Sequence, residues 1–135
     1  MTGTAITVLG LAAWTLLLLL LIAAMRVKLT VSGEKRANSF KPTGEDMTPF
    51  GQRLTRAHAN CYEHLPIALA LLLYAMQTGN TSMTDATGPV FLAARIAQTA
   101  VHLYSVRNRY VTIRFGFFVV QVLLMALWIA ALAFG

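Results

Sequence analysis

Four long apolar runs divide the sequence, and short polar stretches connect them. They cover about residues 4–26, 54–78, 87–106 and 113–134. As an α-helix rising about 1.5 Å per residue, each run is long enough to cross a bilayer core of roughly 30 Å. The pattern predicts an all-α integral membrane protein. We expect a four-transmembrane-helix bundle, built as a single domain from residues 1–135.

The first run also has to be weighed against a cleavable signal peptide. Positive charge follows this run, at Arg26 and Lys28, instead of preceding it. No short apolar region leads to a cleavage site of small residues. We therefore expect residues 4–26 to form a retained first span.

Basic residues alternate between the connections, and this alternation predicts the topology. The polar loop at about 27–52 and the connection between the third and fourth spans are rich in Lys and Arg, whereas the second connection carries only Asp85. By the positive-inside rule, loops 1 and 3 are cytoplasmic and both termini lie on the opposite face. Arg95, inside the third span, is the one exception. No eukaryotic targeting signal is recognisable, so we expect a bacterial inner membrane.

Composition excludes several other classes of protein. The chain is 57% hydrophobic and 12% charged, with a net charge of +6. The basic residues flank spans, so topology explains them better than nucleic-acid binding does. The single cysteine, Cys61, excludes an intrachain disulfide. His58 and His64 are six residues apart and cannot share a helix face as a ligand pair does, so we expect no metal.

Two polar stripes interrupt the apolar pattern of the middle spans. On a helix, Arg56, Asn60 and Glu63 are spaced i, i+4, i+7 and share one face. The third span repeats the pattern with Arg95, Gln98 and His102. Ionisable groups inside spans are costly, so they usually face the bundle interior, pair with each other or line a cavity.

Spacing alone leaves two interpretations of these stripes open. In the structural one, Glu63 and Arg95 form an interhelical ion pair, and Arg53 and Arg56 reach the headgroups. In the functional one, the stripes bind a small zwitterionic peptide. Arginine recognises carboxylates, asparagine recognises amides, and a glutamate can receive an ammonium group.

Three segments of the chain resemble one known family. "RAHANCYEHLP" resembles the second-helix signature R-A-x-x-N-x-x-E of the membrane-associated proteins in eicosanoid and glutathione metabolism, the MAPEG family. "ARIAQTAVHLYSV" resembles the third-helix pattern of that family, and "VTIRFGFF" resembles its arginine at the start of the fourth helix. With the four-span count, the resemblance covers nearly the whole chain.

The resemblance implies a homotrimer that binds glutathione between neighbouring subunits near the cytoplasmic side. Arg26 reaches the ligand from the adjacent subunit, and Arg114, or failing it Arg109, stabilises the thiolate. The expected glutathione-binding residues of the second and third helices are Arg56, Asn60, Glu63, His64, Arg95, Gln98 and His102.

The implied activity is that of a membrane-bound glutathione transferase. Glutathione is the co-substrate, no metal takes part, and the second partner is a hydrophobic electrophile or lipid arriving from the membrane. Reduction of lipid hydroperoxides is a further activity of the family. Phe115 replaces a serine of one synthase branch, which argues against prostaglandin synthesis.

Two departures keep a second function open. His102 stands where many members have tyrosine, and Gln98 stands where several have histidine or tyrosine. Loss of that tyrosine favours a non-catalytic glutathione- or lipid-binding protein of the same fold. A transporter is a third hypothesis, but it requires polar groups along the whole span, and here they stop about halfway.

Overall fold

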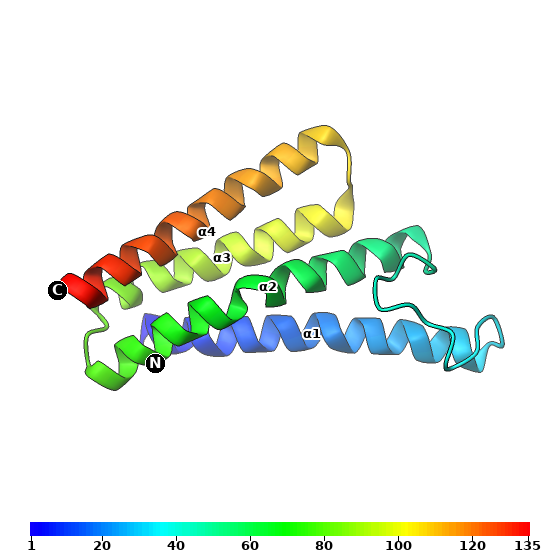
Figure 1. Ribbon diagram of the computed structural model, residues 1–135, viewed down its shortest axis with the longest axis horizontal. Helices are drawn as coiled ribbons and strands as arrows, with labels where there is room; N and C mark the ends of the chain where they lie inside the picture. The colour runs from blue at the N-terminus through cyan, green and yellow to red at the C-terminus, as the bar shows by residue number, and fades with distance from the viewer.

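Four antiparallel helices form the whole molecule in the computed structural model, which describes residues 1–135. They are α1 (Gly3–Val31), α2 (Pro49–Thr78), α3 (Ser82–Tyr104) and α4 (Asn108–Phe134). Figure 1 shows both termini at one end of the bundle, with the connection between α2 and α3. The segment 32–48, which we call the cap loop, and the connection 105–107 lie at the other end.

The helices extend beyond the predicted apolar runs because local signals set their ends. The Thr48 hydroxyl accepts from the Gly51 N–H, and Pro49 occupies the first turn of α2, where no N–H is needed. Gly79 ends α2 with a φ of 70°, a left-handed conformation that glycine adopts without strain. The predicted 27–52 loop is therefore shorter, because residues 27–31 and 49–52 are helical.

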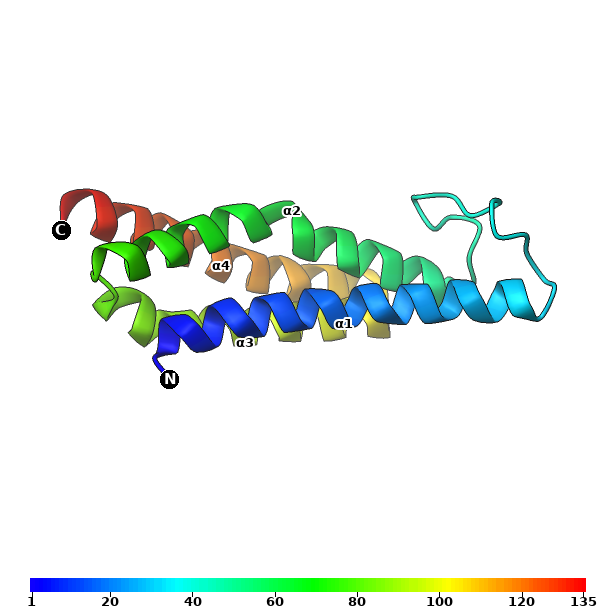
Figure 2. The ribbon, with the colours of Figure 1, turned by 90° about the horizontal axis from the view of Figure 1, so that it is seen from below.

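Pro66 bends α2 near its middle, as the sequence predicts. Proline has no N–H to donate, and its ring crowds the preceding turn. Figure 2 shows α2 changing direction near its middle, and Pro66 lies inside this helix, which is continuous from Pro49 to Thr78.

Two of the four helices carry the membrane signal most strongly. The helices α1 and α4 are each long and apolar enough to cross a bilayer, and only a small part of either is buried in the bundle. A core helix of a soluble protein is mostly buried, so this exposed leucine and phenylalanine surface indicates a membrane protein. The helices α2 and α3 carry the polar stripes and are less apolar along their length.

The central helices α2 and α3 hold the bundle together, since the backbone of each lies close to all three other helices, whereas the backbones of α1 and α4 do not approach each other closely. The main apolar core draws on all four helices. Its fully buried members include Leu72, Phe91 and Trp128, and the Trp128 indole donates to the Thr87 hydroxyl at 2.7 Å. A smaller core of Leu18, Ile22, Leu54 and Cys61 joins α1 to α2.

At the end opposite the cap loop, α1 and α3 approach closely. Any Cβ on Gly3 would meet the backbone of Asp85. In return, Asp85 Oδ1 accepts from the Thr4 N–H at 2.8 Å and from the Thr4 hydroxyl at 2.6 Å. The carboxylate therefore satisfies a free donor in the first turn of α1, where negative charge also suits the helix dipole.

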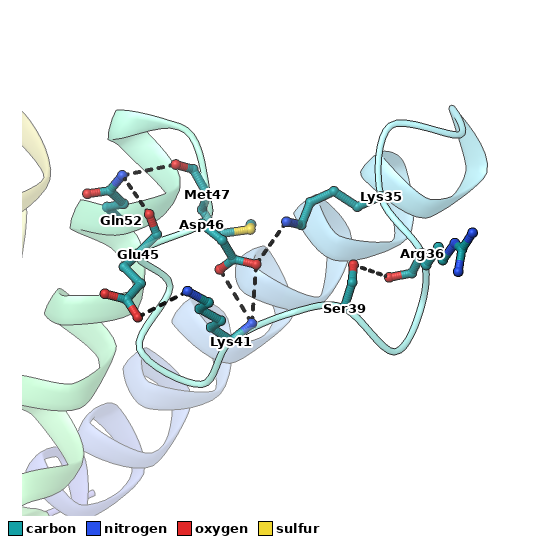
Figure 3. A network of polar contacts seen from close by, with 8 residues as sticks. All are labelled: Lys35, Arg36, Ser39, Lys41, Glu45, Asp46, Met47 and Gln52. Atoms are coloured by element: carbon teal, nitrogen blue, oxygen red, sulfur yellow. Dashed lines mark hydrogen bonds and ion pairs between the residues drawn. The ribbon is translucent and has the colours of Figure 1, made fainter.

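An ion pair and several hydrogen bonds hold the cap loop in place (Figure 3). Lys35 Nζ lies 2.8 Å from Asp46 Oδ2, and Gln52 Nε2 donates to the Met47 carbonyl at 3.0 Å. Gly44 has a φ of 74° and lies against the Thr55 side chain, so both its conformation and its surroundings favour glycine. The loop is thus an ordered cover over this end of α1 and α2.

The cap loop should loosen in acid. The hydrogen bond from Lys35 holds the pKa of Asp46 below its ordinary value of 3.8. A lowered folded-state pKa means that the ion pair contributes fully above about pH 3.8 and is lost as the pH falls through the lower folded value. We expect the amide hydrogens of residues 35–47 to exchange with solvent faster once the pH falls below the lowered pKa of Asp46, after correction for the intrinsic exchange rates. Asp46→Asn should exchange fast already at pH 6, and equal protection in both proteins would contradict this role.

Candidate functional site

A polar cavity opens where α2, α3 and α4 meet at the cap-loop end. Its volume is about 430 Å³. Figure 1 shows α4 diverging from α3 towards this end. The polar side chains that line the cavity are Arg56, Asn60, Glu63, His102 and Arg114.

The α2 stripe forms one wall of this cavity, as its i, i+4, i+7 spacing predicts. Arg56, Asn60 and Glu63 come from successive turns of α2 and all reach the same space. Neither Arg56 nor Glu63 makes an ion pair within the subunit. Their charged groups are therefore available to a ligand.

Arg114 faces this wall from the second turn of α4. Its Nε atom is buried and has no hydrogen-bond partner in the subunit. A buried guanidinium N–H without an acceptor is costly, and an anionic ligand removes that cost. With Arg56 in the same cavity, two guanidinium groups face one carboxylate, so the cavity favours a ligand with more negative than positive groups.

His102 completes the cavity from the last turn of α3 and is 4% exposed. Its Nδ1 lies 3.2 Å from Asn60 Nδ2. This bond ties the third helix to the α2 wall at the level of the charged groups. Close by, Arg53 Nε donates to the Leu103 carbonyl at 2.8 Å and so satisfies a free acceptor at the end of α3.

The predicted ion pair between Glu63 and Arg95 is wrong. Arg95 is 3% exposed, and its two Nη atoms contact the Asn60 carbonyl, at 3.1 Å, and His64 Nε2. No carboxylate lies within ion-pair distance. Arg95 thus lies behind the α2 wall instead of lining the cavity, and it binds the backbone of Asn60 rather than the side chain of Glu63.

Two other predicted ligand residues also lie outside the cavity. His64 contacts Arg95 and packs edge-on against Phe118, with 5.7 Å between the ring centres. Gln98 is buried and accepts a hydrogen bond from Gln121 Nε2 at 2.7 Å. Within one subunit both residues support the helix interfaces.

The remaining predicted arginines point elsewhere. Arg109 lies on the surface, over the ring of Tyr110, and donates to its hydroxyl at 3.1 Å. Arg26 lines a second cavity, of about 790 Å³, between α1, α2 and the cap loop. Its Nε is buried without a partner, and Arg56 lines both cavities.

Sequence reasoning missed Gln121, although a signal was present. It is fully buried and is the only strongly polar side chain in the apolar part of α4. Such a residue in a span usually bonds to a neighbouring helix. It bonds to Gln98 and to the Phe117 carbonyl, while its own Oε1 has no partner.

The cavity contains no metal-binding arrangement, because no three His, Cys, Asp or Glu side chains come together anywhere in the chain. Its chemistry is that of anion recognition by two arginines, with an amide, an imidazole and one carboxylate beside them.

Comparison with known proteins identifies the family. The MAPEG family model matches residues 4–134 of the 135-residue chain. No curated protein and no solved structure matches it. The match covers all four helices, including the α2 stripe and Arg114. The chain therefore belongs to the MAPEG family.

Proposed function

We propose that this protein is a membrane-bound glutathione transferase. The observation that carries the proposal is the cavity in which Arg114, with its unpartnered Nε, faces Arg56, Asn60 and Glu63. Glutathione carries two carboxylates, one ammonium group and two amides. This set of groups complements two arginines, one glutamate and one asparagine.

The proposed chemistry is nucleophilic attack by the glutathione thiolate. A free thiol titrates near pH 8.5, so a guanidinium beside the sulfur increases the thiolate fraction at neutral pH. The thiol proton leaves to solvent, the sulfur forms a bond to the electrophilic carbon, and the leaving group departs with its electron pair. Hydrophobic electrophiles partition into the bilayer and reach the site laterally. In a second proposed reaction, the reduction of a lipid hydroperoxide, the thiolate attacks a peroxide oxygen, the lipid alcohol leaves, and a second glutathione converts the resulting sulfenic acid to glutathione disulfide and water.

In the proposed arrangement all four helices span a bacterial inner membrane, with the cap loop and the connection 105–107 in the cytoplasm. The basic residues of both segments support this orientation. The proposed assembly is a homotrimer. Within one subunit Arg26 and Arg114 line different cavities, and a neighbouring subunit that brings its own Arg26 to the Arg114 cavity would complete the proposed site.

The test is the ultraviolet difference spectrum of glutathione thiolate on mixing with the purified protein in detergent. We expect a thiolate band for the native protein. Arg114→Ala should reduce it about tenfold at neutral pH, since one charge-assisted hydrogen bond is lost. Arg107→Ala removes an equal charge from the exposed 105–107 connection and should leave the band unchanged.

Two other results would contradict the proposal. Binding seen by calorimetry without any thiolate band favours the non-catalytic binding protein, an alternative that the histidine at position 102 supports. An equal loss in Arg114→Ala and Arg107→Ala contradicts the assigned role of Arg114.

A further inference from the structure

The His102 imidazole closes the cavity from α3. It is almost fully buried, yet it lines the same space as Arg56 and Arg114. One ring nitrogen, Nδ1, lies 3.2 Å from Asn60 Nδ2. The other, Nε2, makes no hydrogen bond within the subunit. Nε2 is therefore the free polar atom of the ring.

The bond to Asn60 fixes the tautomer. An amide nitrogen only donates, so His102 Nδ1 accepts and carries no proton. A neutral imidazole has a single N–H, which must then be on Nε2. The free nitrogen of His102 is thus a hydrogen-bond donor.

The surrounding charges keep the ring neutral. His102 is buried, Arg56 on α2 and Arg114 on α4 line the same cavity, and Arg53 binds the neighbouring Leu103 carbonyl, so a further positive charge on the ring is unfavourable. Glu63, also on α2, lines the cavity but forms no ion pair with the ring. The hydrogen-bond partner of the His102 ring, Asn60, is uncharged. The site therefore holds a neutral N–H donor among guanidinium groups.

We propose that His102 donates this Nε2–H hydrogen bond to the sulfur of the thiolate bound in the cavity, with Asn60 as the residue that positions the ring. The inference rests on the proposed glutathione site and adds a second donor to Arg114. A hydrogen bond to an anion stabilises it more than one to a neutral group. His102 then favours the thiolate over the thiol without itself gaining or losing a proton.

The test follows thiolate formation against pH in three proteins. His102→Phe keeps the bulk and removes the donor, whereas His102→Gln places an amide N–H₂ close to the position of Nε2. We expect His102→Phe to raise the pH at which half of the bound glutathione is thiolate by about one unit, and His102→Gln to restore most of that shift. At a pH well below the half-titration point, where the bound sulfur is still protonated, glutathione affinity by calorimetry should change by less than about threefold, because a donor that favours the thiolate contributes little to binding the thiol.

Equal half-titration points in the native protein and in His102→Phe would overturn the inference. A His102→Gln variant that behaves like His102→Phe would overturn it too, since a donor would then not suffice. Failure of the native protein to bind glutathione would instead overturn the proposed function.

A second measurement does not depend on glutathione. Nitrogen-15 spectra of histidine-labelled protein in detergent distinguish the two neutral tautomers. Protonation of His102 at Nε2, lost or mixed in Asn60→Ala, is the expected result. A proton on Nδ1 in the native protein would overturn the inference, even if the variants at position 102 do not fold.

Discussion

Arg56→Ala is expected to weaken glutathione binding about a hundredfold, close to 2.7 kcal/mol, within the range for a hydrogen bond between charged groups. Arg56 is exposed in the subunit and makes no hydrogen bond or ion pair there. Its removal therefore costs the ligand a charged partner and costs the fold little. Calorimetry of glutathione binding to the detergent-solubilised variant measures the change.

The matched control for this variant is Arg107→Ala. Arg107 is exposed in the connection 105–107, and it lines a separate surface depression beside Tyr104. Both substitutions remove one positive charge at the same end of the bundle. A comparable loss of affinity in both variants would mean that the overall positive field, and not the cavity, attracts the ligand.

Arg95→Leu is expected to lower the free energy of unfolding by about 2 to 4 kcal/mol, because two partly buried acceptors lose their buried donor. The Asn60 carbonyl and His64 Nε2 both contact the Arg95 guanidinium. Water does not reach this position to replace it, since Arg95 is 3% exposed. Thermal unfolding in a fixed detergent, followed by circular dichroism, measures the loss.

Desolvation of the Arg95 guanidinium acts in the opposite direction to its two hydrogen bonds. Burial of a guanidinium without a carboxylate is itself unfavourable, and an apolar side chain of similar size avoids that cost. Unchanged or higher stability in Arg95→Leu would show that desolvation exceeds the two hydrogen bonds. Arg107→Leu, at an exposed position, controls for the general effect of adding an apolar side chain.

The fold could be predicted from the sequence because long apolar runs and alternating basic connections are strong, local signals. The helix ends were less predictable, since caps such as Thr48 and Pro49 lie outside the apolar runs. The folding of residues 32–48 over the bundle could not be predicted. It depends on contacts such as the one between Lys35 and Asp46, which need the helices in place first.

The candidate site was predictable only along single helices. Helical spacing placed Arg56, Asn60 and Glu63 on one face, and all three line the cavity. Residue spacing along one helix does not reveal how far that helix is shifted along the bundle axis relative to its neighbour. This axial shift decides which side chains meet across the two helices. Arg95 lies level with the Asn60 carbonyl and His64, so the expected pair with Glu63 does not form.

The two outer helices are more apolar than the two central ones, and this difference affects how the chain inserts into the membrane. On the proposed topology, α1 and α4 can each partition into lipid unaided, whereas α2 and α3 carry polar groups that lipid does not accommodate. The bonds that satisfy those groups, from Arg95 to the Asn60 carbonyl and between Asn60 and His102, exist only between α2 and α3. We therefore expect α2 and α3 to insert into the membrane together, so that α2 enters the lipid only after α3 has been synthesised.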